Sequence, residues 1–77
     1  MNITITYFGK LTELTGRSSE ELEVDDVSLN GIRSALERAY PVMKTMSYQI
    51  AENNRILMAE DSVQSQQLDV FPPFSGG

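Results

Sequence analysis

One stretch of this chain carries apolar residues at the spacing of a long α-helix, and no other stretch of that length does so. The stripe recurs every three or four residues and consists of Leu29, Ile32, Leu36 and Tyr40, with Ala35 and Ala39 between them. Ser28 precedes it as a candidate N-cap, and Pro41 follows it, where the residue before a proline avoids the helical region. A chain of 77 residues forms one domain, so this helix must cover whatever sheet the other residues build. The stripe is therefore predicted to belong to the core rather than to a partner groove.

Five short segments around the helix are rich in β-branched, aromatic or alternating apolar residues, which is typical of strands. They are residues 2–8, 20–24, 47–51, 55–58 and 67–71. Residues 10–15 favour a helical turn that stops at Gly16, and Asn53-Asn54 favours a tight turn. The order predicts an α+β fold in which a curved, mixed sheet of four or five strands packs on one main helix. A parallel pairing of the first and last strands at the sheet centre would make the helical segment their crossover.

The net charge of the chain indicates which class of macromolecule it binds. The chain has 11 acidic and 6 basic residues, a net charge of −5, which argues against nucleic acid and favours a partner protein with a basic surface. Several of the acidic residues cluster around the second predicted strand: Glu20, Glu21, Glu23, Asp25 and Asp26. They lack the loop spacing and the central glycine of a calcium site, so they indicate a solvated edge strand.

Cysteine and histidine are both absent. Their absence excludes disulfides, thiolate nucleophiles, sulfur-ligated metals and the commonest general base, and we predict no metal site. So small a domain has little room for a deep cavity, which places any site at a surface or a terminus. The longest apolar stretch, residues 56–59, is far shorter than the ~20 residues that span a membrane. The first residues lack the basic and apolar regions of a signal peptide, so we expect a cytoplasmic protein with no membrane contact.

The last residues favour an extended segment that projects from the domain. We expect a domain over residues 1–71 and an extended C-terminal tail over residues 72–77. Pro72 and Pro73 fix φ and resist collapse, while Gly76 and Gly77 have no side chains and can enter a narrow active site. Six extended residues could reach roughly 20 Å.

Three segments, at matching spacing, point to one family. They are residues 7–16, the turn Ala51-Glu52-Asn53 and the terminal heptad of residues 71–77. They resemble the first strand end and helical turn, the Ala-Val-Asn turn, and the terminal Phe-Pro-Pro-Val-Ser/Thr-Gly-Gly of MoaD-type proteins. These proteins are the small subunit of molybdopterin synthase and are close to the thiamine sulfur carrier ThiS. The resemblance covers essentially the whole chain and implies a ubiquitin-like β-grasp fold.

The resemblance also implies a role as a sulfur carrier, not as an enzyme on its own. In such proteins an adenylating enzyme uses ATP to activate the terminal glycine carboxylate, and a sulfur-donor protein converts the adenylate to a thiocarboxylate. The large subunit of the heterotetrameric synthase then receives the tail and passes its sulfur to a pterin precursor, without a cofactor bound by the small subunit. This chemistry falls on Gly77. The implied partner-binding positions are Pro72, Pro73, Phe74, Ser75 and Gly76.

Three positions depart from the family pattern. Gln64-Ser65-Gln66 replaces the usual Asp-Gly-Asp turn before the last strand, and Phe74 replaces a smaller β-branched residue. Glu52 stands where an aliphatic residue is usual, which suggests a side chain that faces solvent.

Three alternatives stay open at this point. The sulfur could serve thiamine thiazole synthesis rather than molybdopterin. The chain could instead be a ubiquitin-like modifier that is attached through Gly77 to lysines of other proteins, since adenylation precedes either fate. Finally, it could be a non-covalent docking module whose tail is inert.

Overall fold

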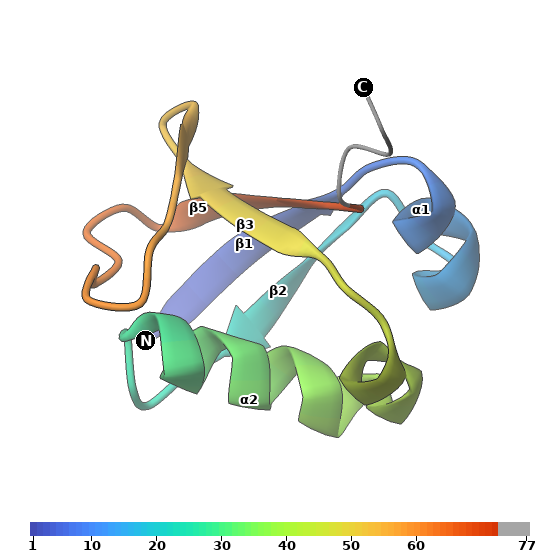
Figure 1. Ribbon diagram of the computed structural model, residues 1–77, viewed down its shortest axis with the longest axis horizontal. Coiled ribbons are helices and arrows are strands. Elements are labelled where there is room, and N and C mark those ends of the chain that lie inside the picture. The colour runs from blue at the N-terminus through green and yellow to red at the C-terminus, as the bar shows by residue number, and fades with distance from the viewer. Residues whose placement is uncertain (73–77) are drawn as a thin grey trace.

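The first and last strands lie side by side at the centre of one sheet (Figure 1). Strand β1 spans Asn2–Tyr7 and strand β5 spans Gln67–Phe71, and they pair in parallel with Ile5 opposite Leu68. The computed structural model describes residues 1–72. Within that part of the chain the sheet has five strands, in the order β2-β1-β5-β3-β4. The helical segment between β1 and β5 is thus their crossover, as the sequence suggested.

Antiparallel pairing adds the other three strands. Strand β2 (Ser19–Glu23) flanks β1 at one edge, β3 (Gln49–Glu52) flanks β5, and β4 (Arg55–Ile56) forms the other edge. The acidic strand β2 is an edge strand, as predicted. The expectation of a solvated acidic cluster is wrong for Glu20, because only 13% of its side chain is exposed and it accepts hydrogen bonds from Tyr7 and Tyr40. Strand β4 ends at Ile56 rather than Met58, because the carboxylate of Asp61 accepts the Met58 N–H at 2.7 Å and turns the chain.

The turn between β3 and β4 is the predicted asparagine pair. Asn53 and Asn54 adopt φ values of 52° and 66°. Asparagine tolerates this left-handed region better than other residues with a side chain, because its short amide can bond locally to the backbone.

Helix α2 (Leu29–Ala39) begins at the predicted N-cap. The Ser28 hydroxyl accepts the Gly31 N–H at 3.1 Å, and the Ser28 N–H donates to Asp26 at 2.9 Å. That second hydrogen bond holds the pKa of the exposed Asp26 carboxyl below its ordinary value. Gly31 is a poor helix former, but the Asp26 carbonyl occupies the place where its Cβ would lie, so space explains the glycine.

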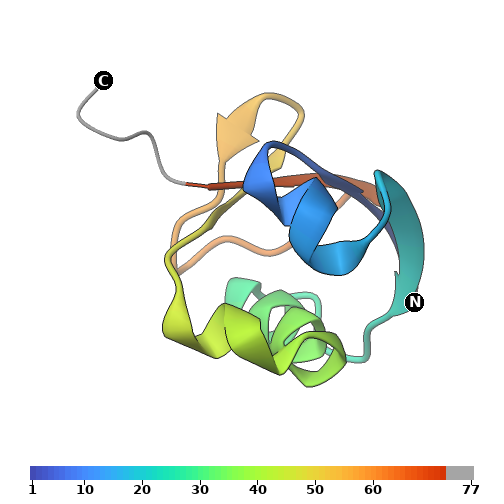
Figure 2. The ribbon, with the colours of Figure 1, turned by 90° about the vertical axis from the view of Figure 1, so that its right-hand side faces the viewer.

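Helix α2 runs across one face of the sheet (Figure 2). The buried residues of its apolar stripe belong to the same core cluster as the strand side chains. Leu29, Ile32 and Leu36 are buried, whereas Tyr40 is half-buried and Ala39 is exposed. The strand side chains that complete this core include Ile3, Ile5, Tyr7, Ile50, Leu68 and Val70. The stripe therefore belongs to the core, as predicted.

Pro41 both ends α2 and begins an element that the sequence did not predict. Tyr40 has φ −134° and ψ 84°, outside the helical region, as expected before a proline. Residues Pro41–Thr45 then form a 3-10 helix, η1, whose Met43 is completely buried. So short an element has no apolar period to detect. Among residues 1–72, no helix has the length and apolar character needed to cross a membrane.

Glu52 is buried, and the expectation that its side chain faces solvent is wrong. Only 6% of the residue is exposed, and its Oε2 accepts the N–H groups of Gln64 at 2.7 Å and Ser65 at 2.6 Å. Alternation along β3 explains the burial, since Glu52 lies two residues after the buried Ile50 and so on the same face. A carboxylate from β3 thus holds the Gln64-Ser65-Gln66 segment.

We expect Glu52→Ala to lower the free energy of unfolding by about 1–3 kcal/mol, because two backbone N–H groups lose their acceptor. Glu52→Gln keeps an acceptor oxygen in place and should cost less. Urea unfolding of both variants and the wild type measures the difference. Equal midpoints for Glu52→Ala and Glu52→Gln would contradict this role of the carboxylate.

Candidate functional site

The segment that the sequence assigns to partner binding begins at Pro72, directly after β5. Pro72 is the one predicted site residue inside the described part of the chain. The other predicted site residues lie outside the described residues: Pro73, Phe74, Ser75, Gly76 and Gly77. Their roles, and the division into a domain and a tail, stay predictions. The structure defines instead the surroundings from which the segment starts.

Pro72 packs against the corner that follows β1. The Phe8 N–H donates to the Val70 carbonyl at 3.0 Å, which continues the contact between β1 and β5 beyond Tyr7. Gly9 follows with φ 59° and ψ −135°, and a Cβ on this residue would lie 3.3 Å from Cγ of Pro72. The Pro72 ring therefore lies next to the space that a side chain on Gly9 would fill. Phe8, beside them, is 46% exposed.

Helix α1 (Lys10–Thr15) holds this corner in place. The N–H and the hydroxyl of Thr12 both donate to the Gly9 carbonyl, at 3.1 and 2.7 Å. Leu11 is completely buried and anchors the helix on the core. The helix stops at Gly16, which has φ 77°, so the predicted turn and its glycine stop are both confirmed.

Sequence reasoning assigned no role to Gly9. The available signal was a glycine placed between a strand and a helical turn, a position that often needs positive φ. Its contact with Pro72 has no local signal, since it depends on the pairing of β1 with β5.

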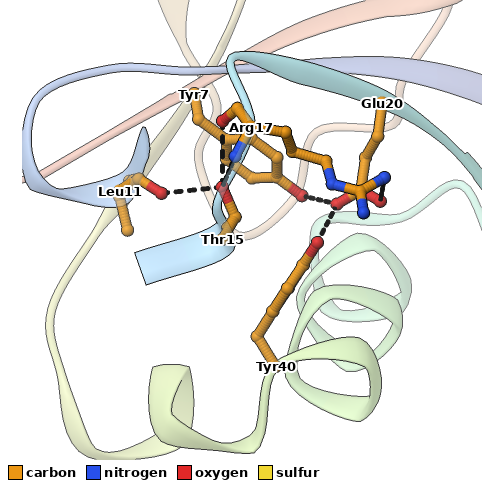
Figure 3. A network of polar contacts seen from close by, with 6 residues as sticks. All are labelled: Tyr7, Leu11, Thr15, Arg17, Glu20 and Tyr40. Atoms are coloured by element: carbon orange, nitrogen blue, oxygen red, sulfur yellow. Dashed lines mark hydrogen bonds and ion pairs between the residues drawn. The ribbon is translucent and has the colours of Figure 1, made fainter. Parts of the chain in front are cut away.

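A polar cluster fixes the end of β1 just before this corner (Figure 3). The hydroxyls of Tyr7 and Tyr40 both donate to Oε2 of Glu20 at 2.5 Å, and their rings pack edge to face at 6.1 Å. Nη1 of Arg17 lies 3.4 Å from the other oxygen of Glu20. The cluster ties β1, β2 and the end of α2 together.

Burial raises the pKa of Tyr7, and the hydrogen bond to the Glu20 carboxylate adds to the effect. The pKa of Tyr40 is raised by the same two causes. The third tyrosine, Tyr48, donates to Glu37 at 2.7 Å, and burial and this bond raise its pKa as well.

The protein is therefore expected to lose stability as the pH rises above about 10, the ordinary tyrosine pKa. The folded state retains its tyrosyl protons where the unfolded chain releases them, so this stabilisation is complete below that pH and decreases above it. Phenolate absorbance should appear together with the loss of circular dichroism. Ionisation of any of the three tyrosines at its ordinary pKa in the folded protein would contradict the assignment.

Within residues 1–72, neither a metal-binding cluster nor the hollow beside α2 marks the start of the C-terminal segment. No group of three or more Asp or Glu side chains suited to a metal ion lies within residues 1–72. A hollow of about 260 Å³ lies beside α2 and the end of β2, lined by Val24, Asp25, Ala35 and Arg38 among others, and Pro72 does not line it. The C-terminal segment thus begins at the Pro72 ring, beside the backbone corner at Gly9. Such a structure can present a segment to another protein.

The model of the ThiS family matches residues 5–77, which covers the whole described fold except its first four residues. The chain belongs to the ThiS family. Members of this ThiS/MoaD-like family are ubiquitin-like sulfur carriers; they are not enzymes themselves and act with partner enzymes. A search of curated proteins found no match.

Solved structures share the fold of this ThiS family member. Small archaeal modifier protein 1 from Haloferax volcanii is 21% identical, with a TM-score of 0.78 over 100% of both chains. A second crystal structure of that protein gives 19% identity and the same TM-score, over 95% of this chain and 98% of that chain. A protein from Pyrococcus furiosus, described as molybdopterin converting factor, subunit 1, is 19% identical, with a TM-score of 0.84 over 96% of this chain and 99% of that chain. These likenesses confirm the predicted ubiquitin-like β-grasp fold.

Proposed function

We propose that this chain is the sulfur carrier of molybdopterin synthesis. In this proposal an adenylating enzyme uses ATP to activate the carboxylate of Gly77, and a sulfur-donor protein converts the adenylate to a thiocarboxylate. The large subunit of molybdopterin synthase then receives the C-terminal segment, and the sulfur passes to its pterin precursor. Pro72, Pro73, Phe74, Ser75 and Gly76 contact the partners.

The observation that carries the proposal is the reach of the family match, which extends through the final Gly76-Gly77. A match to the domain alone would support only the fold. The Pyrococcus furiosus protein with the same fold, described as a molybdopterin converting factor subunit, supports the choice of pathway.

The chemistry of the terminus suits this reaction. A C-terminal carboxylate has a pKa of about 3.3–3.7, so it is ionised at neutral pH and can attack the α-phosphate of ATP. A new bond forms from the carboxylate oxygen to phosphorus, and pyrophosphate leaves. Carboxylates are poor electrophiles, but the acyl-adenylate has a good leaving group, so a sulfur nucleophile can attack the acyl carbon and release AMP. The cysteine, histidine or metal that these steps need would reside on the partners, since this chain has no cysteine or histidine.

Intact mass tests the proposal. The protein is incubated with its adenylating enzyme, ATP and a sulfide source, and the mass should rise by the difference between sulfur and oxygen, localised to Gly77 by fragmentation. An unchanged mass, when the same enzyme preparation converts a control carrier, would falsify the proposal.

The name of the family keeps the thiamine pathway as a second candidate. Both pathways predict the same thiocarboxylate, so the discriminating measurement is which synthase copurifies with the tagged carrier. Recovery of a thiazole synthase instead of the large molybdopterin synthase subunit would favour thiamine.

The Haloferax volcanii modifier protein supports a third candidate, attachment to other proteins through Gly77. This fate predicts covalent ladders on denaturing gels of the native host, and the ladders should disappear when Gly77 is deleted. The docking-module alternative predicts instead that removal of Gly76 and Gly77 leaves function intact.

A further inference from the structure

We propose that Gly9 and Pro72 form a seat that sets the direction in which the C-terminal segment leaves the domain, and that this seat positions Gly77 for reaction. Gly9 and Pro72 would be positioning residues, since neither touches the reacting atoms. The inference rests on the proposed function of Gly77. It identifies the part of the folded domain that determines the rate at which Gly77 is adenylated.

One half of the seat is the backbone of Gly9. Its φ of 59° and ψ of −135° form a combination that residues with a Cβ rarely adopt, and the turn from β1 into α1 requires it. A Cβ here would lie 3.3 Å from Cγ and 3.5 Å from Cδ of Pro72. Glycine therefore gives the corner its shape and also gives the proline ring its place.

The other half of the seat is Pro72, at the end of the central strand β5. Its ring fixes φ, and it has no N–H with which to extend the ladder, so the chain must leave the sheet here. Burial and backbone hydrogen bonds anchor both halves. Val70, just before, is completely buried and accepts the Phe8 N–H, and Thr12 donates twice to the Gly9 carbonyl.

A fixed exit direction matters because the reacting carbon lies five residues further along the chain. Five extended residues span at most about 18 Å, so a change of roughly 10° at the seat moves the far end by about 3 Å. A misplacement of only about 1 Å can slow an enzymatic step by roughly 10²-fold. When the domain docks on an enzyme and the terminus enters its active site, the seat therefore limits how often the carboxylate is aligned for attack.

The matched pair Gly9→Ala and Gly16→Ala tests this role. Both glycines have positive φ and border α1, so both substitutions strain the backbone. The strain is smaller at Gly16, whose φ of 77° and ψ of 14° lie in the left-handed region that other residues can enter, and a Cβ there would meet no atom within 4 Å. The double variant described below separates this difference in strain from the effect on the proline ring. The reaction measured is adenylation by the cognate enzyme, at a temperature where unfolding curves show every variant folded. We expect Gly9→Ala to lower kcat/KM by roughly 10- to 100-fold, mainly through kcat, and Gly16→Ala to stay within about twofold of the wild type.

Pro72→Gly changes the other half of the seat and leaves the backbone corner at Gly9 unchanged. It removes the ring and frees φ, so we expect a loss of kcat of about threefold or more with little change in the unfolding midpoint. The double variant Gly9→Ala/Pro72→Gly should be no slower than Pro72→Gly alone, because without a ring the new Cβ has nothing to displace.

Three results would overturn the seat. They are equal kinetics for Gly9→Ala and Gly16→Ala, a wild-type kcat for Pro72→Gly, and effects of Gly9→Ala and Pro72→Gly that simply multiply in the double variant. The wild type reports separately on the underlying function: no adenylation of the wild type by an enzyme active on a control carrier would overturn the proposed function and the seat together. Pro72→Gly keeps the test decisive even if Gly9→Ala does not fold.

Discussion

Deletion of Gly77 is expected to abolish thiocarboxylate formation, with a fall in rate of at least about 10²-fold. The shortened chain still ends in a glycine carboxylate, but that group sits about 3.5 Å short of its place. Adenylation requires the carboxylate in line with the α-phosphate, and extra binding cannot replace the missing reach. The reaction is followed by AMP release and by intact mass.

The same deletion should leave stability unchanged, because the buried residues of the described domain run from Ile3 to Val70. Urea unfolding curves of the deletion variant and the wild type should superimpose. A shifted curve would mean that the last residue supports the fold, and full thiocarboxylate formation by the deletion variant would remove Gly77 from the chemistry.

Leu36→Ala is expected to lower the free energy of unfolding by about 2–5 kcal/mol. Leu36 is completely buried on the face of α2 that packs against the sheet, so truncation leaves a cavity as well as removing apolar contact. Domains of this kind have total stabilities of only about 5–15 kcal/mol, so a large share of the population could unfold. Loss of function in this variant should follow the unfolded fraction.

Ser34→Ala is the matched control on the same helix. Ser34 is exposed, and alanine is the better helix former, so stability should change by less than about 0.5 kcal/mol. A cost below about 1 kcal/mol for Leu36→Ala, measured in the same urea series, would mean that the core closes around the smaller side chain.

Local patterns predicted most of the architecture. The stripe from Leu29 to Leu36, the Ser28 cap and the stop at Gly16 each depend on residues within one or two turns of each other, so the sequence displays them directly. The pairing of β1 with β5 followed from two strand-like segments at opposite ends of a chain with one helix. The end of β4 and the helix η1 depend instead on Asp61 and on the docking of Met43, which no short window contains.

The candidate site divides in the same way. Its terminal residues can be predicted from the sequence, because the proposed chemistry requires little more than glycine and proline at the end of the chain. The Gly9 contact arises only when two distant segments become neighbours in the sheet, so the sequence alone does not reveal it. Glu52 is a different case. The alternation that puts Ile50 in the core also puts Glu52 there. The expectation that Glu52 faces solvent came instead from its charge, at a position where the family usually has an aliphatic residue.

The central place of β5 has a consequence for biosynthesis. Strands β1 and β2 can pair before β5 is made, and so can β3 and β4, but no sheet pairing joins these two hairpins until residues 67–71 have emerged from the ribosome. The complete sheet therefore cannot form during translation until its last strand is available. A prematurely terminated product that lacks those residues lacks the middle of its sheet, so it should be cleared by proteases before it can compete with the finished carrier.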